Sequence, residues 1–365
     1  MSEYFPHGAG LGARGGVEYR AYYIARELAK HHEVTVYTTF EEGVPVFYDV
    51  DGIRVVSVPP KSDYSHSSNI SKRLQFTLNA SRVLRRERND LVDSYSHMAY
   101  PAGWNSNSRI KFVTYHDVWK GRWSDILGPR GFFGEILESY NLSRGWDHFI
   151  SVSQYTKDNL IAAGIDADRI SVIHNGVDCK RFSEINVEKR DVPTICVVAR
   201  LVQYKRVGDV ILALKKLSGD FPDLRLEVVG SGPLREDLVE MSRRMGLSER
   251  IVFHGFVESH MDVIRILKSC HCFVLPSVIE GFGMTPIEAM ACGIPYAASD
   301  IPPIREATGG GRGGVLYEPG DIGALTSAIT DILEGRVRPD PDFARERYDW
   351  GGIASQVRGL YESYI

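Results

Sequence analysis

The sequence has no apolar run long enough to cross a bilayer. A spanning helix needs roughly 18 or more consecutive apolar residues, and every apolar stretch in the chain is shorter. The N-terminus also lacks the basic segment followed by an apolar one that marks a secretory signal. We therefore predict a protein that neither spans a membrane nor is exported, with a cytoplasmic location.

Cysteine is scarce, odd in number and scattered. The five cysteines are Cys179, Cys196, Cys270, Cys272 and Cys292. This usage suits a reducing compartment rather than a disulfide framework. Cys270-His271-Cys272 is the one pattern that suggests a metal, but alternate residues of a strand point to opposite faces and no second ligand pair completes a tetrahedral site. We predict no metal there.

An excess of basic residues is also absent. The chain has 43 Lys and Arg against 47 Asp and Glu, a formal net charge of -4, which argues against nucleic acid as a partner. No repeat and no low-complexity tract occurs. What is present is a chain of 365 residues, 43% hydrophobic and 25% charged. That is the composition of a soluble globular protein long enough for two domains.

Short apolar, β-rich runs alternate with helical patterns throughout the chain. In the first half the strands are predicted at Val34–Thr38, Ile53–Val58, Lys111–Thr114, His148–Val152 and Ile170–His174, and the helices at Val17–Lys30, Ser71–Arg88 and Gln154–Ala163. In the second half the strands are predicted at Thr194–Val198, Leu224–Val229, Ile251–Phe253, Cys272–Leu275, Pro295–Ala298 and Val315–Tyr317. The helices between them are predicted at Val207–Leu217, Leu234–Met245, Met261–Lys268, Pro286–Cys292 and Ile322–Leu333.

This alternation predicts an α/β protein made of two doubly wound domains with parallel sheets. We place the domains at residues 1–182 and 183–347, joined by a charged connector at 181–191. A final helix within 348–365 has an apolar face that must be buried. Ligands of such sheets lie beyond the carboxyl ends of the strands, so we expect a site in the cleft between the two domains.

The stretch from Ser277 to Pro295 has the pattern of an anion site. The strand 272–275 runs into a loop with Gly281 and Gly283, and a helix is predicted to begin at Thr285 with Pro286 as its first residue. Unpaired N–H groups at a helix start favour a phosphate, and glycines allow it to come close.

Two carboxylates bracket this stretch, Glu280 on the loop and Glu288 one turn into the helix. Carboxylates accept hydrogen bonds, so they suit the hydroxyls of a ligand rather than its phosphates. Two other interpretations stay open. Thr285 and Glu288 fit a capping box, and Glu280 alone fits a solvated loop carboxylate.

Cations follow the first strand of the second domain, in the segment Ala199-Arg200-Leu201-Val202-Gln203-Tyr204-Lys205. The guanidinium of Arg200 and the ammonium of Lys205 are suited to hold a diphosphate and to stabilise the charge on it when it leaves. Two solvated loop cations would give the same spacing. Gly15-Gly16 at the start of helix 17–30 is a second candidate phosphate contact, or a flexible turn.

Two further loops follow strands. His116 and Asp117 come after strand 111–114, where His116 could orient a hydroxyl or stabilise charge, and Asp117 could fix its ring or bind an acceptor. A structural histidine is the alternative. The segment 230–233, Gly-Ser-Gly-Pro, could admit a nucleotide or be a plain turn. We interpret 174–178, His-Asn-Gly-Val-Asp, as a hinge loop and the Asp-Ala-Asp at 166–168 as a turn.

Taken together, these motifs resemble the retaining glycosyltransferases of family 4. The resemblance covers nearly the whole chain and is carried by Glu280 and Glu288 in EGFGMTPIEAMACGIP, by Arg200 and Lys205 in ARLVQYK, and by 15–18, 174–178 and 230–233. It implies the GT-B architecture, two Rossmann-like domains facing a central cleft, with the last helix returning to the first domain. It also implies a nucleoside diphosphate sugar as donor, a hydroxyl acceptor on a glycan, lipid or small molecule, and retention without metal or cofactor.

The resemblance also implies a role for each matching residue. Arg200 and Lys205 would bind the donor diphosphate, Glu288 the ribose and Glu280 the sugar, with His116 near the transferred sugar. The remaining donor contacts would come from Gly16, Gly230, Val257, Phe282, Gly283 and Met284. Of these, Gly16 would offer its amide to the phosphates and Val257 lies in the segment similar to the part that lines the base.

One departure concerns the N-terminus. Members of that family begin with a complete apolar strand, whereas this chain starts Met1-Ser2-Glu3-Tyr4-Phe5-Pro6. We therefore expect the first strand to be shortened or absent, as after a misplaced start. The loss of this strand would leave the Gly15-Gly16 loop mobile and weaken the phosphate contact predicted there.

The acceptor side is marked only by the basic residues of helix 71–88. Either this helix contacts anionic lipid headgroups at the inner face of a membrane or it is a solvated basic face. Two other functions also fit the scaffold, a sugar-nucleotide epimerase and a non-catalytic nucleotide-sugar-binding module. The sequence assigns neither the sugar and base of the donor nor the oligomeric state.

Overall fold

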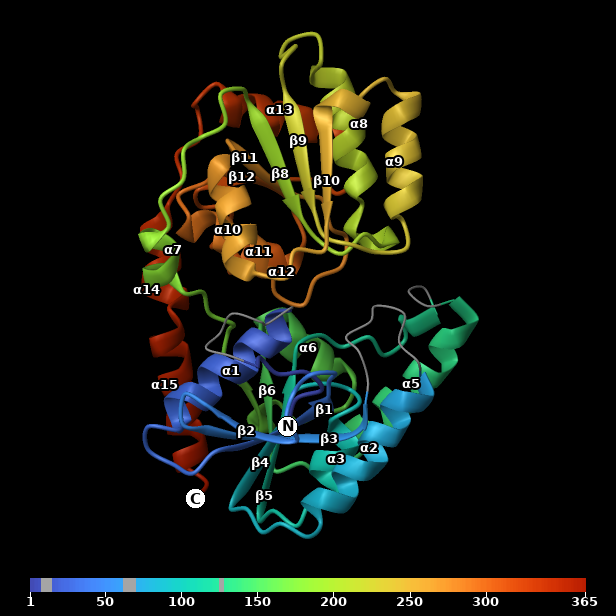
Figure 1. The fold of residues 1–365 in the computed structure, drawn as a ribbon, viewed down its shortest axis with the longest axis vertical. Coiled ribbons are helices and arrows are strands. Elements are labelled where there is room, and N and C mark those ends of the chain that lie inside the picture. The colour runs from blue at the N-terminus through green and yellow to red at the C-terminus, as the bar shows by residue number, and fades with distance from the viewer. Residues whose placement is uncertain (8–14, 62–69, 125–127) are drawn as a thin grey trace. The chain divides into compact units, whose positions relative to one another are not determined.

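The chain forms two compact units in its computed structural model, which describes residues 1–7, 15–61, 70–124 and 128–365 (Figure 1). One unit comprises Met1–Asn175 and Trp350–Ile365, and the other comprises Gly176–Asp349. Each is built mainly from parallel strands with helical crossovers. The prediction of two doubly wound α/β domains is therefore confirmed.

The first unit contains two groups of strands. They are β1 Thr35–Phe40, β2 Phe47–Val50, β3 Ile53–Lys61, β4 Leu91–Ser94, β5 Ile110–Tyr115, β6 His148–Ser151 and β7 Ile170–Val172. The strand order is β1-β3-β2 in one sheet and β4-β5-β6-β7 in the other. All pairs are parallel except β2 with β3, because β2 is a short edge strand that turns back directly into β3.

The N-terminal residues lie between these two sheets. The backbone of Ser2 and Glu3 bonds to Tyr37 and Thr39 of β1, and the carbonyl of Met1 accepts from the N–H of Tyr95, just after β4. Residues 1–3 thus occupy the place of the first strand. The expected shortened strand is reduced to a few ladder bonds, and Phe5 beyond it is buried in the core.

Helices cover the first unit on both faces. They are α1 Gly16–Leu28, α2 Ile70–Leu84, α3 Tyr100–Trp104, α5 Gly131–Leu142, α6 Gln154–Ala162 and α15 Trp350–Glu362. The last helix, α15, packs on α1, where the rings of Tyr23 and Trp350 stack with centroids 5.0 Å apart. Ile353, Val357 and Tyr361 are buried, so the apolar face predicted for this helix lies in the core of the first unit.

The second unit has one six-stranded parallel sheet. Its strands are β8 Thr194–Val198, β9 Arg225–Val229, β10 Ile251–Gly255, β11 Cys272–Leu275, β12 Tyr296–Ser299 and β13 Gly314–Tyr317. Its helices are α7 Cys179–Glu184, α8 Val207–Leu217, α9 Arg235–Arg244, α10 His260–Ser269, α11 Met284–Ala291, α12 Pro302–Ala307, α13 Ile322–Leu333 and α14 Pro341–Tyr348. Helices α8, α9 and α13 cover one face, and α10 and α11 the other (Figure 1).

Some elements were not predicted. They include α5, α7, α12, α14, β2 and β4. Part of the segment expected to be a charged connector, 181–191, is therefore helical, because Asp178 caps α7 by accepting from the N–H of Arg181 at 3.1 Å.

Candidate active site

Several predicted donor residues of the second unit lie in the loops at the point where the strand order of its sheet reverses. The strand order is β10-β9-β8-β11-β12-β13, so the chain moves outward from β8 on one side and from β11 on the other. Arg200 and Lys205 follow β8, and Glu280 follows β11. Loops at such a switch point diverge and leave room for a ligand.

Lys205 and Glu280 are in direct contact. The Nζ of Lys205 lies 2.5 Å from Oε1 of Glu280, and each side chain is only 14% exposed. Lys205 belongs to a short 3₁₀ turn, Gln203–Lys205. Neither group is the solvated loop residue that the sequence left as an alternative, and each neutralises the charge of the other.

Arg200 remains exposed and contacts Tyr204. One guanidinium nitrogen of Arg200 donates to the hydroxyl of Tyr204. The carbonyl of Tyr204 accepts from the N–H of Val278 at 2.9 Å, which ties the loop after β8 to the loop after β11. Sequence reasoning missed Tyr204, although it stands between Arg200 and Lys205.

The helix after β11 starts earlier than predicted. Helix α11 begins at Met284 and its N-cap is Gly283, which has a left-handed backbone with φ of 100°. The predicted start at Thr285, with Pro286 first, is therefore wrong. Glycine accepts a positive φ without a steric penalty, and Phe282 just before it is buried against Tyr348, with ring centroids 5.5 Å apart.

The capping box left open as an alternative for Thr285 and Glu288 is absent, since no side chain caps α11. Glu288 is buried, and its Oε1 lies 3.0 Å from Nε2 of His260, the first residue of α10. This contact between His260 and one carboxylate oxygen restrains the orientation of the Glu288 side chain. The sequence offered only the helix start after Ser259 as a signal for His260.

Gly230 is required by packing. A Cβ on it would lie 1.9 Å from the carbonyl oxygen of Ala199, and its φ is 132°. Its N–H donates to the carbonyl of Gly255 at 2.8 Å. The loop after β9 therefore lies directly against the loop that carries Arg200. Val257, two residues beyond β10, is half-buried.

In the first unit, His116 follows β5 as predicted. Burial, together with the Arg20 cation and His97, holds the pKa of His116 well below its usual range, so the ring is neutral. Among the described residues its buried Nε2 has no hydrogen-bond partner, and neither has Nδ1 of His97. The Nε2 of His116 is therefore a hydrogen-bond donor or acceptor that a ligand hydroxyl can satisfy.

Asp117 holds its own loop rather than the ring of His116. Its Oδ1 accepts from the N–H of Val118 at 2.8 Å, and its Oδ2 accepts from Nε1 of Trp119 at 2.6 Å. Glu138 of α5 binds the same loop through the N–H of Trp119 and Nε1 of Trp123. The sequence missed Glu138.

Gly16 is the first residue of α1, and Gly15, its N-cap, has an extended backbone. Gly12, Ala13 and Arg14, which precede them in the sequence, lie outside the described residues. One turn on, Arg20 is fully buried and donates to the carbonyl of His174 at 2.7 Å and to the side chain of Asn175 at 3.1 Å. The predicted hinge loop is thus bonded to α1.

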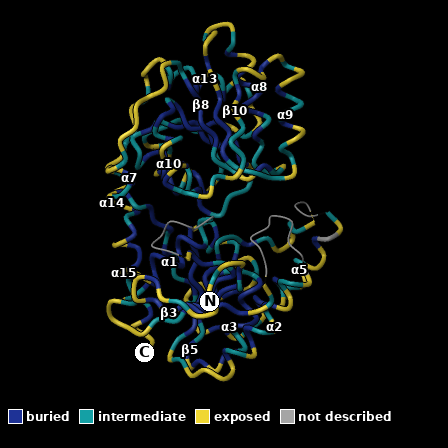
Figure 2. The backbone as a smooth tube through the Cα atoms, in the orientation of Figure 1, coloured by how far each residue is buried: buried dark blue, intermediate teal, exposed yellow. Residues whose placement is uncertain are grey.

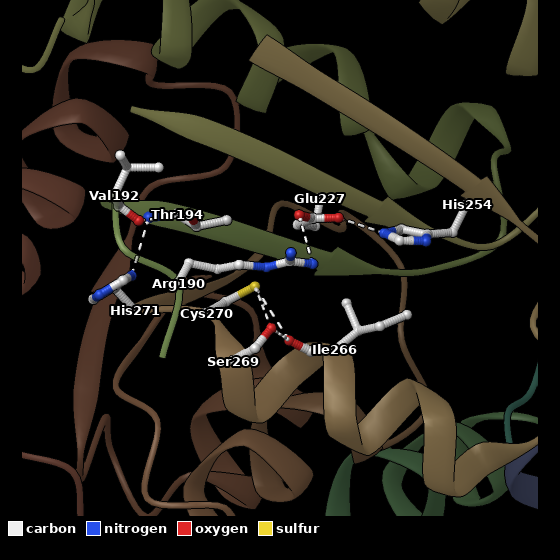
Figure 3. A network of polar contacts seen from close by, with 9 residues as sticks. All are labelled: Arg190, Val192, Thr194, Glu227, His254, Ile266, Ser269, Cys270 and His271. Atoms are coloured by element: carbon white, nitrogen blue, oxygen red, sulfur yellow. Dashed lines mark hydrogen bonds and ion pairs between the residues drawn. The ribbon is translucent and has the colours of Figure 1, made fainter. Parts of the chain in front are cut away.

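Cys270 and His271, which precede β11, belong to a polar network that includes Thr194 at the start of β8 (Figure 3). Nδ1 of His271 accepts from the N–H of Thr194 at 3.2 Å, and all five cysteines are free. Buried Glu227 pairs with Arg190 and with His254. Within the part of the chain that the structure describes, no three His, Cys, Asp or Glu side chains are grouped to hold a metal ion.

The site and the fold define a class of protein. Two Rossmann-like α/β units, with acidic and basic side chains meeting at the switch point of the second sheet, are the architecture of GT-B glycosyltransferases. Solved structures agree. Sucrose-phosphate synthase from Thermosynechococcus elongatus matches with a TM-score of 0.80 at 20% identity, over 96% of this chain and 93% of the other. HepE of Anabaena, solved with UDP and glucose, matches with a TM-score of 0.75 at 19% identity, over 98% of each chain.

Family models cover the chain in two parts. The model "Glycosyltransferase Family 4" matches residues 14–181, and "Glycosyl transferases group 1" matches residues 179–349. One component of the human phosphatidylinositol N-acetylglucosaminyltransferase is 27% identical over 95% of this chain and 73% of its own length. The lipopolysaccharide 1,6-galactosyltransferase of Salmonella typhimurium is 29% identical over 54% of this chain and 55% of its own length. These matches support a group 1 glycosyltransferase of the GT-B type.

Proposed function

We propose that this chain transfers a hexose from a nucleoside diphosphate sugar to a hydroxyl acceptor, with retention of the anomeric configuration and without a metal ion. The observation that carries the proposal is the contact between Lys205 and Glu280 at the switch point of the second sheet, 2.5 Å apart and mostly buried. A cation and a carboxylate side by side can bind the two parts of such a donor, its phosphate and its sugar hydroxyls.

In this proposal Arg200 and Lys205 bind the diphosphate and stabilise the negative charge that develops on it. Glu280 accepts hydrogen bonds from the sugar hydroxyls, and Glu288, oriented by His260, accepts from the ribose. The amides of Phe282, Gly283 and Met284 at the start of α11 are further phosphate and sugar contacts. The resemblance to family 4 glycosyltransferases is the basis for the donor contacts proposed for Gly16, Gly230 and Val257.

The proposed reaction is a single displacement on one face of the sugar. The bond from the anomeric carbon to the diphosphate oxygen breaks, and the bond to the acceptor oxygen forms on the same face. The acceptor oxygen attacks the anomeric carbon directly, so no enzyme nucleophile is needed, and the acceptor proton passes to the leaving phosphate oxygen. His116, neutral because of its lowered pKa, is assigned to the transferred sugar, and Asp117 is assigned to positioning the loop on the acceptor side.

The names of similar proteins guide the choice of substrates to test. HepE was solved with UDP-glucose, which supports a uridine diphosphate sugar, with a guanosine diphosphate sugar as the second choice. The names of the human and Salmonella relatives contain phosphatidylinositol and lipopolysaccharide. We therefore propose a glycan or lipid-linked acceptor. Among the described residues no helix has the length and apolar character needed to cross a bilayer.

The test is incubation with uridine, guanosine and adenosine diphosphate sugars while nucleoside diphosphate release is measured, with and without acceptor extracts. We expect release that increases with acceptor, and a product whose new linkage has the anomeric configuration of the donor. Tight donor binding without release or transfer would instead favour a binding module. Conversion of the donor sugar without an acceptor product would favour an epimerase.

A further inference from the structure

Helix α5 turns an apolar face to solvent. Phe132 is 62% exposed, Phe133 is 71% exposed and Ile136 is 52% exposed, and Tyr140 continues the same face one turn later. Residues four apart lie on one side of a helix, so these side chains form a continuous stripe. Soluble proteins rarely leave such a patch uncovered unless it meets a partner.

The polar side chains of α5 explain why this face points outward. Glu135 accepts from the N–H of Gly121 at 2.8 Å, and Glu138 accepts from Trp119 and Trp123. Asn141 donates to the carbonyl of His97 at 3.2 Å. Both carboxylates of the helix are therefore bound to the loop after β5. The apolar stripe remains on the other side.

Helix α2 presents a matching stripe. Leu74 is 49% exposed and Leu78 is 58% exposed. Arg82 follows four residues after Leu78, and Arg85 comes directly after the last residue of α2. No Asp or Glu occurs in α2. Both helices bond to the same short segment of the chain. Thr77 of α2 donates to the carbonyl of Met98, and Asn141 of α5 donates to the carbonyl of the adjacent His97.

The stripe of α5 also ends in a cation. The guanidinium of Arg144 lies 4.2 Å from the ring centroid of Tyr140. Each stripe is thus apolar in its N-terminal part and basic at its C-terminal end. Figure 1 shows both helices on the same side of the first unit, and Figure 2 shows exposed stretches along them.

We propose that this surface, made of Leu74, Leu78, Arg82, Arg85, Phe132, Phe133, Ile136, Tyr140 and Arg144, docks the protein on a bilayer with anionic lipids. The apolar side chains enter the boundary between headgroups and acyl chains, and the arginines bind the lipid phosphates. A tyrosine at the edge of an apolar patch suits the same interface. The sequence pointed only to the basic residues of helix 71–88, and α5 adds the apolar part.

The charge of the two stripes selects this partner. The charged residues of the surface are all arginines, and the carboxylates of α5 are bound elsewhere. A phosphate-bearing bilayer offers both an apolar layer and a negative layer, which the surface needs together. The proposal does not depend on the transfer reaction, because it concerns only binding to lipid.

The test is flotation of the full chain with phosphatidylcholine vesicles, with and without phosphatidylglycerol, at low and high salt. We expect the wild type to float with the anionic vesicles and less so at high salt. Phe132→Ser together with Phe133→Ser should lower the bound fraction about tenfold or more. Phe47→Ser is the matched control, since Phe47 of β2 is 63% exposed in the same unit but lies outside the surface.

The charge arm uses a second pair of variants. Arg82→Glu with Arg85→Glu should weaken binding to anionic vesicles by about fivefold or more per arginine. Lys215→Glu with Lys216→Glu makes the same charge change at the end of α8 and should have little effect. Circular dichroism and thermal melts show that each variant is folded.

Three results would overturn the proposal. One is a wild type that floats with neither kind of vesicle. Another is a Phe132/Phe133 variant that floats as well as the wild type. The third is a wild type that is a dimer by sedimentation and becomes monomeric in that variant, because the surface would then be covered by a second copy of the chain.

Discussion

The predicted site of the second unit consists of charged side chains, whereas the predicted site of the first unit centres on a neutral histidine. In the second unit, Lys205 is paired with Glu280 and Glu288 with His260, while Arg200 stays exposed and donates to the hydroxyl of Tyr204. In the first unit, His116 lies beside the ring of Tyr95, with centroids 6.3 Å apart, and near the Arg20 cation, and its Nε2 has no partner among the described residues. A paired site keeps its charges near neutrality until a ligand arrives, whereas a buried neutral histidine offers hydrogen bonding without charge.

The comparison predicts the largest effect for Glu280→Gln in the second unit. The amide keeps the shape but loses the charge that receives the sugar hydroxyls and balances Lys205. We expect transfer to fall on the order of 10²–10³-fold, with nucleotide diphosphate affinity nearly unchanged by calorimetry. Glu318→Gln is the control, an exposed carboxylate just beyond β13 of the same sheet. Unchanged turnover in Glu280→Gln would refute the assigned role.

His116→Gln in the first unit should have the next largest effect, a loss of about 10²-fold in turnover. Because burial keeps the pKa of His116 well below its usual range, the ring is neutral across the working pH. The wild-type turnover measured from mildly acidic to alkaline pH should therefore show no step near pH 6.5 that the variant lacks. Such a step would mean that His116 titrates normally and that the two sites differ less than proposed.

Glu138 tests whether the loop after β5 depends on a single buried carboxyl. Burial raises the pKa of Glu138 from 4.5 to about 7. Between these values the folded protein keeps a proton that the unfolded chain has lost. The resulting stabilisation is complete below about pH 4.5 and is lost as the pH rises through about 7.

We therefore expect the unfolding free energy of the wild type, relative to Glu138→Gln, to fall by up to about 3 kcal/mol as the pH rises from 4.5 to 8. Urea denaturation at several pH values measures it. Glu135→Gln removes the other carboxylate of α5 and should leave this pH dependence in place. A constant difference between the wild type and Glu138→Gln at every pH would contradict the assignment.

Local patterns in the sequence were enough for most of the fold. Helices at Val207–Leu217 and Ile322–Leu333 and the strand Cys272–Leu275 have the predicted bounds, because their apolar periodicity agrees with their tertiary setting. The chain also brings together Lys205 and Glu280, which were predicted separately as donor contacts, although they are 75 residues apart. The strand order explains this, since parallel strands place both loops at one edge.

The errors have physical causes. The predicted helix start at Thr285 is wrong because Gly283, in a left-handed conformation, caps the helix and Met284 begins it. The capping box, an open alternative, is absent because Glu288 bonds to His260. Helix α5 contains two glycines and directs apolar residues outward, so periodicity gave no sign of it. Partners distant in sequence, such as His260, leave no local signal.

The smallest predicted effect distinguishes two buried histidine–glutamate pairs of the second unit. His260 orients Glu288, the proposed ribose contact, whereas His254 pairs with Glu227 in the network of Figure 3. His260→Ala should raise the KM for the donor up to about tenfold with little change in kcat, because it loosens a group that binds substrate and transition state equally. His260→Gln, whose amide can reach the same oxygen, should restore most of the loss.

His254→Ala should lower the melting temperature without changing the donor KM, since its partner lies outside the proposed site. If both alanine variants raised the KM equally, orientation of Glu288 would not be the cause, and the loss would reflect general loosening of the unit.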